Sequence, residues 1–316
     1  MKVAVLDDYQ GVALSMADWR SLGPAVSVQT FREPIAAAAL ASTLRDFEII
    51  VAMRERTPLP RTLIDQLTSL KLLVTTGRRN ASIDIKAAAD RGIPVSGTAT
   101  QSTGPTELTW GLILSLARHI PEESMAMRTG AWQATVGMGL HGKVLGVVGV
   151  GRLGSEVAKI GRAFGMEVIA WSQNLTADAA SAVGARLVDK MTLFGEADIV
   201  TIHLVLSARS RGIVGDAELN AMKPTAYLIN TARGPIVDEG ALVAALRAKR
   251  IAGAGLDVFD QEPLPANHPL RSLDNVVLTP HLGYVTADNY RGMYTEAVED
   301  IRAFLDGTPI RVIAPH

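Results

Sequence analysis

The sequence predicts an α/β protein with two Rossmann-like or flavodoxin-like domains, each built on a parallel sheet. Short β-rich runs alternate with helical stretches along most of the chain, which is the pattern of βαβ units. The length of 316 residues exceeds that of one typical domain, which has about 100–200 residues. A glycine-rich turn near the middle, Gly149–Gly154, joins a predicted strand to a predicted helix. With 48% hydrophobic and 20% charged residues, the composition is that of a folded globular chain.

The first hundred residues alternate predicted strands with predicted helices. The strands are expected at Val3–Leu6, Val26–Phe31, Ile49–Met53, Leu72–Thr75 and Ile93–Val95. Apolar residues recur at helical spacing in the intervening stretches Ile35–Leu44, Pro60–Leu70 and Ile83–Arg91. Pro60 suits the start of a helix and Gly92 suits a helix end. This alternation predicts one parallel sheet.

A second series of strands follows a long apolar helix. That helix, Gly104–His119, is apolar on nearly every face, so we expect it to be buried. The stretch 121–142 contains four glycines and predicts an irregular segment with short helices. The strands of the second series are expected at Val144–Val148, Glu167–Ala170, Ile199–Leu204, Ala226–Asn230, Gly253–Val258 and Val276–Leu278. They predict a second parallel sheet.

The chain closes on a predicted helix, about Thr286–Leu305, capped by Thr286 and ended by Gly307. We expect the connections between the two sheets near residues 97–104 and again near 283–286.

Composition excludes several classes of function. Lys and Arg number 31 and Asp and Glu number 32, a net charge of −1, which argues against binding nucleic acid or membrane by bulk charge. No apolar run approaches the roughly 18 residues of a membrane span, and the start of the chain does not resemble a secretory signal. Without cysteine, the chain has no disulfide and no thiol nucleophile. No His, Asp and Glu cluster has metal-ligand spacing, so we expect no metal, and we expect a cytoplasmic location.

The glycine-rich turn has the spacing G-x-G-x-x-G between an apolar strand and a helix. The first glycine permits the tight turn, the second lets the backbone approach a pyrophosphate, and the third lets the helix pack on the strand. The helix N-terminus offers unpaired N–H groups to the phosphates. An ordinary glycine-rich βα turn is the alternative. The residues expected to bind a dinucleotide are Gly149, Gly151, Arg152, Leu153 and Gly154.

The second part of this fingerprint departs from the usual pattern. An acidic residue about 20 positions on ordinarily binds the adenosine ribose, but Ser172 occupies that place here. No Arg or Lys follows within 172–177 to bind a 2′-phosphate, and Arg152 is the nearest candidate. The cofactor is therefore expected to be NAD or NADP, with the preference open.

Four ordered motifs together resemble the D-isomer-specific 2-hydroxyacid dehydrogenase family, of the glyoxylate/hydroxypyruvate reductase or phosphoglycerate dehydrogenase kind. They are Leu140–Gly154, Asn230–Asp238, Gly255–Pro263 and Leu278–Gly283. The resemblance implies that residues 101–284 form a dinucleotide-binding Rossmann domain. It implies that residues 1–100 with 285–316 form a flavodoxin-like, substrate-binding domain. The active site would lie in the cleft between the domains, and the family is typically homodimeric.

The resemblance also implies the reaction, which is reversible hydride transfer between NAD(P) and C2 of a small D-2-hydroxy or 2-keto acid. Glyoxylate, hydroxypyruvate and 3-phosphoglycerate are the expected types of substrate. Arg233 would hold the substrate carboxylate and polarise the keto oxygen, for which a planar guanidinium is suited. His281 would be the general acid/base, and Glu262 would orient its ring. A salt bridge, a structural histidine and a surface carboxylate are the respective alternatives.

Further site residues follow from the same resemblance. Thr231, Ala232 and Asp257 would contact the cofactor, with Asp257 beside the nicotinamide carboxamide. Arg54, Gly77 and Arg78 would contact the substrate.

Two positions depart from the family pattern. Arg79 replaces the usual second glycine of the substrate loop, and Val205 stands where relatives carry proline. Arg79 with Arg54 suggests an additional anionic group on the substrate, while solvated surface arginines are an equal alternative.

A different class of function is a dinucleotide-binding redox sensor of the same fold that acts through protein partners. Such proteins are expected to carry extensions for partner docking, so we favour the enzyme. Glu262 argues against formate-oxidising relatives, which typically carry glutamine at that position.

Overall fold

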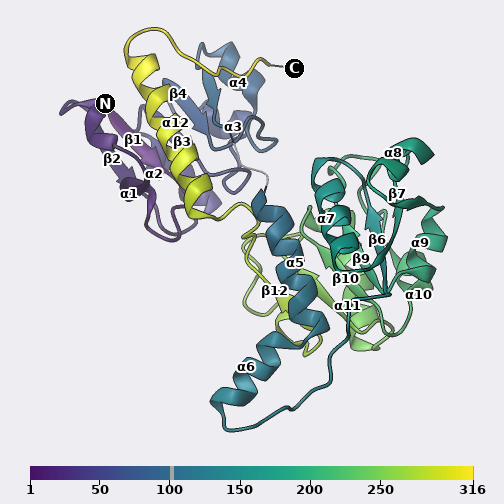
Figure 1. Cartoon of the computed structure of the whole chain (residues 1–316). Coiled ribbons are helices and arrows are strands. Elements are labelled where there is room, and N and C mark those ends of the chain that lie inside the picture. Colours follow the sequence, from purple (N-terminus) through teal and green to yellow (C-terminus); the bar gives the residue numbers. More distant parts are fainter. Residues whose placement is uncertain (100–102, 316) are drawn as a thin grey trace. The chain divides into compact units, whose positions relative to one another are not determined.

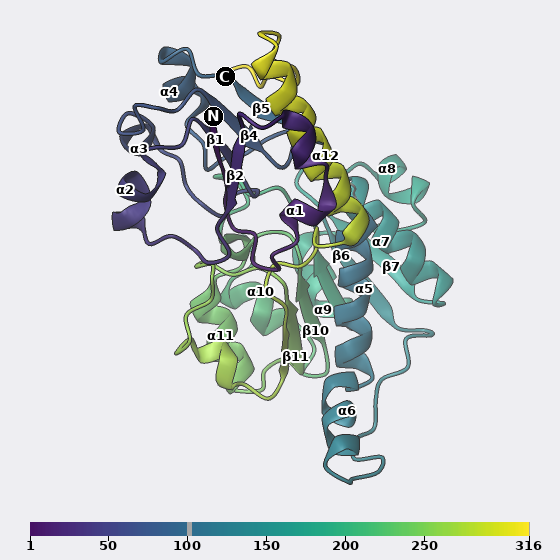
Figure 2. The same cartoon turned by 90° about the vertical axis from the view of Figure 1, so that its left-hand side faces the viewer.

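The computed structural model describes residues 1–99 and 103–315 (Figures 1 and 2). The chain divides into two compact units. Unit 1 comprises Met1–Gln101 and Val285–His316, and unit 2 comprises Ser102–Tyr284. Of the connection expected near 97–104, residues 100–102 lie outside the described residues.

Unit 1 is built on a five-stranded parallel sheet with the order β2-β1-β3-β4-β5. Its strands are β1 (Lys2–Val5), β2 (Ser27–Thr30), β3 (Ile49–Ala52), β4 (Leu72–Thr75) and β5 (Val95–Gly97). This order is that of flavodoxin-like folds. Strands β3 and β4 are buried at every residue, because helices cover both faces of such a sheet. The helices and helical turns are α1 (Ala13–Met16), η1 (Trp19–Leu22), η2 (Ala37–Ala39), α2 (Leu40–Leu44), α3 (Arg61–Ile64), α4 (Ile85–Asp90) and α12 (Ala287–Leu305).

Some bounds in unit 1 differ from the expected ones. Strand β5 begins at Val95 rather than at Ile93, because Pro94 has no N–H to donate to the ladder. Helix α3 ends at Ile64, and turns continue the expected stretch to Leu70. The apolar spacing there places buried side chains correctly, but spacing alone does not distinguish a helix from successive turns.

Unit 2 is built on a seven-stranded parallel sheet with the order β12-β11-β10-β9-β6-β7-β8. Its strands are β6 (Val144–Val148), β7 (Glu167–Trp171), β8 (Arg186–Leu187), β9 (Ile199–Ile202), β10 (Tyr227–Asn230), β11 (Gly253–Leu256) and β12 (Val276–Leu278). The order around β6 is that of a dinucleotide-binding Rossmann fold. The two parallel sheets confirm the predicted fold class. Strand β8 was not expected, because its two exposed residues carry no apolar signal.

The helices of unit 2 include the long apolar helix expected at 104–119. They are α5 (Thr103–Ala117), α6 (Ile120–Arg128), α7 (Arg152–Ala163), α8 (Ala177–Ala182), α9 (Lys190–Glu196), α10 (Asp216–Ala221) and α11 (Glu239–Arg247), with the helical turns η3 (Gly234–Ile236) and η4 (Pro269–Ser272). Helix α5 buries Trp110, Ile113 and Leu116, and burial of the Ile113 and Leu116 side chains stabilises the fold by about 1.5–3 kcal/mol each. Helix α6 and the segment after it project away from the sheet of unit 2 in both views (Figures 1 and 2).

Candidate active site

One edge of the unit 2 sheet collects the site residues expected in this unit. Because all its strands are parallel, their carboxyl ends lie along the same edge, where α/β proteins bind ligands. The turns after β10, β11 and β12 are neighbours and carry Arg233, Glu262 and His281. The turns after β6 and β7 carry the glycine motif and Ser172. The strand order therefore places the predicted catalytic residues, together with Thr231, Ala232 and Asp257, along one half of the edge and the glycine motif with Ser172 along the other.

The glycine turn has the shape that a pyrophosphate requires. A Cβ added to Gly154 would lie 2.0 Å from the Gly149 carbonyl oxygen, and one added to Gly149 would lie 2.9 Å from the His203 carbonyl oxygen. In contrast, no atom lies within 4 Å of a Cβ built on Gly151. Helix α7 begins at Arg152, so its first N–H groups point toward this open space. The glycine turn and the first turn of α7 therefore fit the pyrophosphate of a dinucleotide.

The turn after β7 continues this surface. Gly149 N donates to the Trp171 carbonyl oxygen at 2.8 Å, which joins the ends of β6 and β7. Ser172 follows and is half-buried. The amide of the exposed Gln173 donates to the Arg209 carbonyl oxygen at 3.4 Å, so the loop after β9 reaches the end of β7.

A buried asparagine fixes the turn that carries Arg233. The Asn230 side chain donates to the Arg233 carbonyl oxygen and accepts from Ala232 N, both at 3.0 Å. Gly234 packs against the next turn so closely that a Cβ there would lie 2.1 Å from Phe259 backbone. The Thr231 hydroxyl lies 2.8 Å from that of Thr109 on α5. Sequence analysis missed the role of Asn230, although Asn230 is the first residue of the motif Asn230–Asp238.

Asp257 organises the turn that carries His281. It is 1% exposed and accepts from Thr279 Oγ1 at 2.6 Å, Leu282 N at 2.7 Å and Gly283 N at 2.9 Å. Burial raises the pKa of Asp257 above its usual value, and these hydrogen bonds oppose that shift. The Asp257 side chain therefore fixes the chain on both sides of His281. The resemblance implied a contact of Asp257 with the cofactor and did not indicate this structural role.

His281 and Glu262 are in direct contact. Nδ1 of His281 lies 2.6 Å from Glu262 Oε2, and the other carboxylate oxygen accepts from Phe259 N at 3.0 Å. The backbone of His281 has φ of +54°, a left-handed conformation that residues other than glycine rarely adopt. The Tyr284 ring lies edge-on to the imidazole, with centroids 5.7 Å apart.

In unit 1, the expected substrate residues also lie at the carboxyl ends of strands. Arg54 follows β3 with φ of +52°, and its N–H donates to Thr76 Oγ1 at 3.0 Å. Its guanidinium lies against Gly77, where a Cβ would be 2.2 Å from Arg54 Nη1. Arg78 and Arg79 are exposed, and neither guanidinium has a hydrogen-bond or ion-pair partner among residues 1–99 and 103–315.

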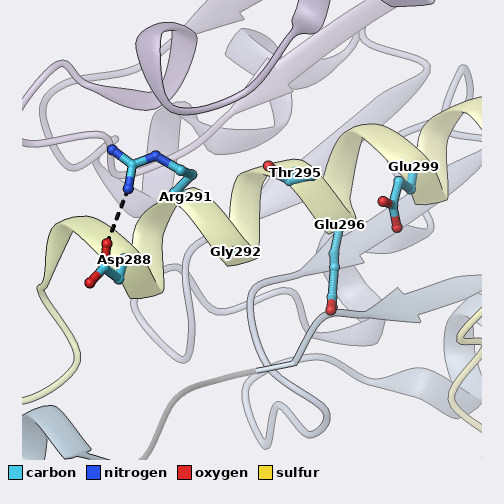
Figure 3. A pocket seen from close by; sticks show the side chains of 6 residues that line it. All are labelled: Asp288, Arg291, Gly292, Thr295, Glu296 and Glu299. Atoms are coloured by element: carbon cyan, nitrogen blue, oxygen red, sulfur yellow. Dashed lines mark hydrogen bonds and ion pairs between the residues drawn. The ribbon is translucent and has the colours of Figure 1, made fainter.

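A hollow of about 530 Å³ in unit 1 lies elsewhere. It follows one face of α12 and is lined by Asp288, Arg291, Gly292, Thr295, Glu296 and Glu299. Figure 3 shows Arg291 paired with Asp288, at 3.1 Å, so the hollow is mainly acidic. It contains no expected site residue. Across the described ranges, no cluster of three metal-ligating side chains and no helix suited to span a membrane is found.

Comparison with known proteins identifies the family. The NAD binding domain of the D-isomer specific 2-hydroxyacid dehydrogenases matches residues 110–283. This confirms the resemblance, and the chain belongs to that family of oxidoreductases, which bind a nicotinamide dinucleotide.

Individual relatives carry more specific names. A glyoxylate reductase of Aeropyrum pernix is 41% identical over 78% of this chain and 76% of the relative. A D-3-phosphoglycerate dehydrogenase of Methanocaldococcus jannaschii is 37% identical over 85% of this chain, but the match spans only 52% of that relative. A crystal structure of a phosphoglycerate oxidoreductase from Vibrio cholerae is 35% identical, with a TM-score of 0.92 over 98% of this chain and 100% of that one.

Proposed function

We propose that the protein reduces a small 2-keto acid to its D-2-hydroxy acid, or catalyses the reverse, with NAD or NADP as cofactor. The contact of 2.6 Å between His281 and Glu262, at the ligand-binding edge of the sheet, carries this proposal. The cofactor, when bound, supplies or accepts the hydride at its nicotinamide ring.

The residues of unit 2 would handle the proton and the negative charge. With Nδ1 of His281 facing Glu262, Nε2 is the nitrogen that gives a proton to the keto oxygen as hydride adds to C2. In oxidation, Nε2 takes the hydroxyl proton. The Glu262 carboxylate stabilises the imidazolium and fixes the ring. Arg233 would pair with the substrate carboxylate and stabilise charge on the reacting oxygen.

Unit 1 would contribute to substrate binding through Arg54, Gly77 and Arg78. The backbone N–H groups of this loop are suited to a carboxylate, and the left-handed Arg54 keeps its guanidinium against the loop.

The same loop supports a substrate with a second anionic group. The Arg79 side chain is exposed. The turn that carries it is anchored, because the buried Asn80 side chain donates to Thr75 Oγ1 at 2.9 Å. We expect Arg79→Ala to raise KM for phosphohydroxypyruvate about five-fold more than KM for glyoxylate. Steady-state kinetics with both substrates measures this, and an equal change in both KM values would contradict it.

We also propose a homodimer formed through α6 and the segment after it. Large apolar side chains on this part of the chain are exposed, including Met125 at 62%, Trp132 at 75% and Val136 at 93%. Sedimentation equilibrium measures the mass in solution, and a stable mass of 33.6 kDa would contradict the dimer.

Absorbance at 340 nm tests the reaction. NADH and NADPH are each assayed with glyoxylate, hydroxypyruvate, phenylpyruvate and phosphohydroxypyruvate, on the wild type and on His281→Ala. We expect activity with at least one 2-keto acid and its loss in the variant. Activity with none of them, or full activity of the variant, would overturn the proposal.

A further inference from the structure

The end of β7 lacks the group that ordinarily excludes NADP. In dinucleotide-binding folds, a carboxylate at this position binds the ribose 2′-hydroxyl and repels a 2′-phosphate. Ser172 stands there, and the stretch 172–177 contains no acidic residue. The half-buried serine hydroxyl can donate to a phosphate oxygen without repelling it.

The loop that carries Arg209 reaches this position. Strands β9, β6 and β7 are consecutive in the sheet, so the loop after β9 lies across the glycine turn from the end of β7. The hydrogen bond of 3.4 Å from Gln173 to the Arg209 carbonyl oxygen fixes that placement. The buried Ser210 holds the loop from within, since its hydroxyl donates to Val205 O at 2.7 Å and accepts from Ser207 N at 2.8 Å.

Two guanidinium groups in this region have no anionic partner in the protein. Arg209 is exposed, as is Arg152 at the first residue of α7, and neither side chain forms a hydrogen bond or ion pair with any described residue. Lys190, by contrast, is engaged by Glu218 at 2.7 Å and by the face of Trp171. Two positively charged residues without an anionic partner therefore stand in the turns after β6 and β9, at the same sheet edge as Ser172, whereas most NAD-specific folds carry a negative charge after the strand equivalent to β7.

We propose that these residues form a 2′-phosphate site, with Arg209 and Arg152 pairing with the phosphate and Ser172 donating to it, so that NADP(H) is preferred over NAD(H). This inference rests on the proposed function, because it concerns the cofactor of the same reaction. Guanidinium groups bind phosphate through paired, charge-assisted hydrogen bonds, which are the strong ones.

Cofactor fragments without nicotinamide test this directly. Isothermal titration calorimetry compares 2′,5′-ADP with 5′-AMP, which differ only in the 2′-phosphate. We expect 2′,5′-ADP to bind at least tenfold tighter at low salt, with the difference shrinking as ionic strength rises. Arg209→Gln should weaken 2′,5′-ADP about tenfold and change 5′-AMP less than twofold. Ser172→Asp should reverse the preference.

The chain offers a matched control two residues away. Arg211 stands on the same loop, but its charge acts on Asp260 beyond β11, so Arg211→Gln should leave the affinities of both fragments within twofold. Equal binding of the two fragments, or equal effects of Arg209→Gln on both, would overturn the inference.

Titration with the intact cofactors separates the two proposals. If NADH binds and is oxidised but NADPH is not preferred, the 2′-phosphate site is wrong and the proposed reaction stands. If neither NADH nor NADPH binds, the proposed reaction fails and the 2′-phosphate site fails with it.

Discussion

Two pairs of histidine and glutamate lie in unit 2, and the backbone around them differs. His281 contacts Glu262 through Nδ1 at 2.6 Å, whereas His268 contacts Glu239 through Nε2 at 2.9 Å. The histidine side chains are 21% and 16% exposed, respectively. Neither the distance nor the exposure therefore tells which pair takes part in the reaction.

The local structure distinguishes them. His268 is the N-cap of η4, and its Nδ1 accepts from Leu270 N at 3.3 Å while Nε2 faces Glu239. Both ring nitrogens of His268 thus take part in contacts that stabilise the fold. His281 is held through its neighbours instead, by the hydrogen bonds that Asp257 accepts from Leu282 and Gly283. His268 therefore acts as a structural cap, whereas Asp257 fixes the turn that carries His281, and this difference can be tested.

Exchanging each histidine for glutamine gives the largest expected effect. His281→Gln should lower kcat about 10³-fold, because glutamine cannot give or take the proton. His268→Gln should leave kcat within about twofold and lower the midpoint of thermal unfolding instead, since it removes a cap. Steady-state kinetics and thermal unfolding of both variants measure this contrast. Similar losses of kcat in the two variants would show that the backbone does not separate the pairs.

Much of the two sheets and of the glycine turn could be predicted because their signals are local. Strand β4 has the bounds expected for Leu72–Thr75, since an apolar run between helical stretches identifies a buried strand. The glycine motif carries its geometry in its spacing, and the structure shows the open space at Gly151 and the tight packing at Gly154.

The remaining features depend on residues far apart in sequence. Asp257 and His281 are brought together only by the pairing of β11 with β12, so no local pattern shows that one holds the other. The contact between Gln173 and Arg209 likewise requires the strand order, because β9 follows β7 in sequence only after two helices and β8. The left-handed conformation of His281 has no sequence signal, since the residue is not glycine.

The variant Asp257→Asn should show whether Asp257 positions His281 or takes part in substrate binding. The amide offers one acceptor where the carboxylate accepts three hydrogen bonds, so at least one donor beside His281 loses its partner. We expect kcat to fall about 30-fold while KM for the keto acid changes less than threefold. Asp238→Asn is the control, because Asp238 caps α11 through Ala241 N at 3.0 Å and asparagine caps equally well. A rise in KM with unchanged kcat would show that Asp257 acts in binding.

A third histidine, His203, extends the comparison, because its partner is a hydroxyl group and not a carboxylate. Nε2 of His203 lies 2.9 Å from Thr201 Oγ1, and burial lowers the pKa of His203 to about 4. Since the unfolded chain binds a proton near pH 6.5 and the folded chain only near pH 4, stability should fall as pH decreases between these values. Asparagine does not titrate. Over this pH range we therefore expect the free energy of unfolding of His203→Asn to fall by about 1–2 kcal/mol less than that of the wild type. Thermal unfolding of the wild type and the variant from pH 4.5 to pH 8 measures the difference. Parallel pH dependences would mean that His203 takes up its proton equally well in the folded state, and that burial without a carboxylate does not keep this histidine neutral.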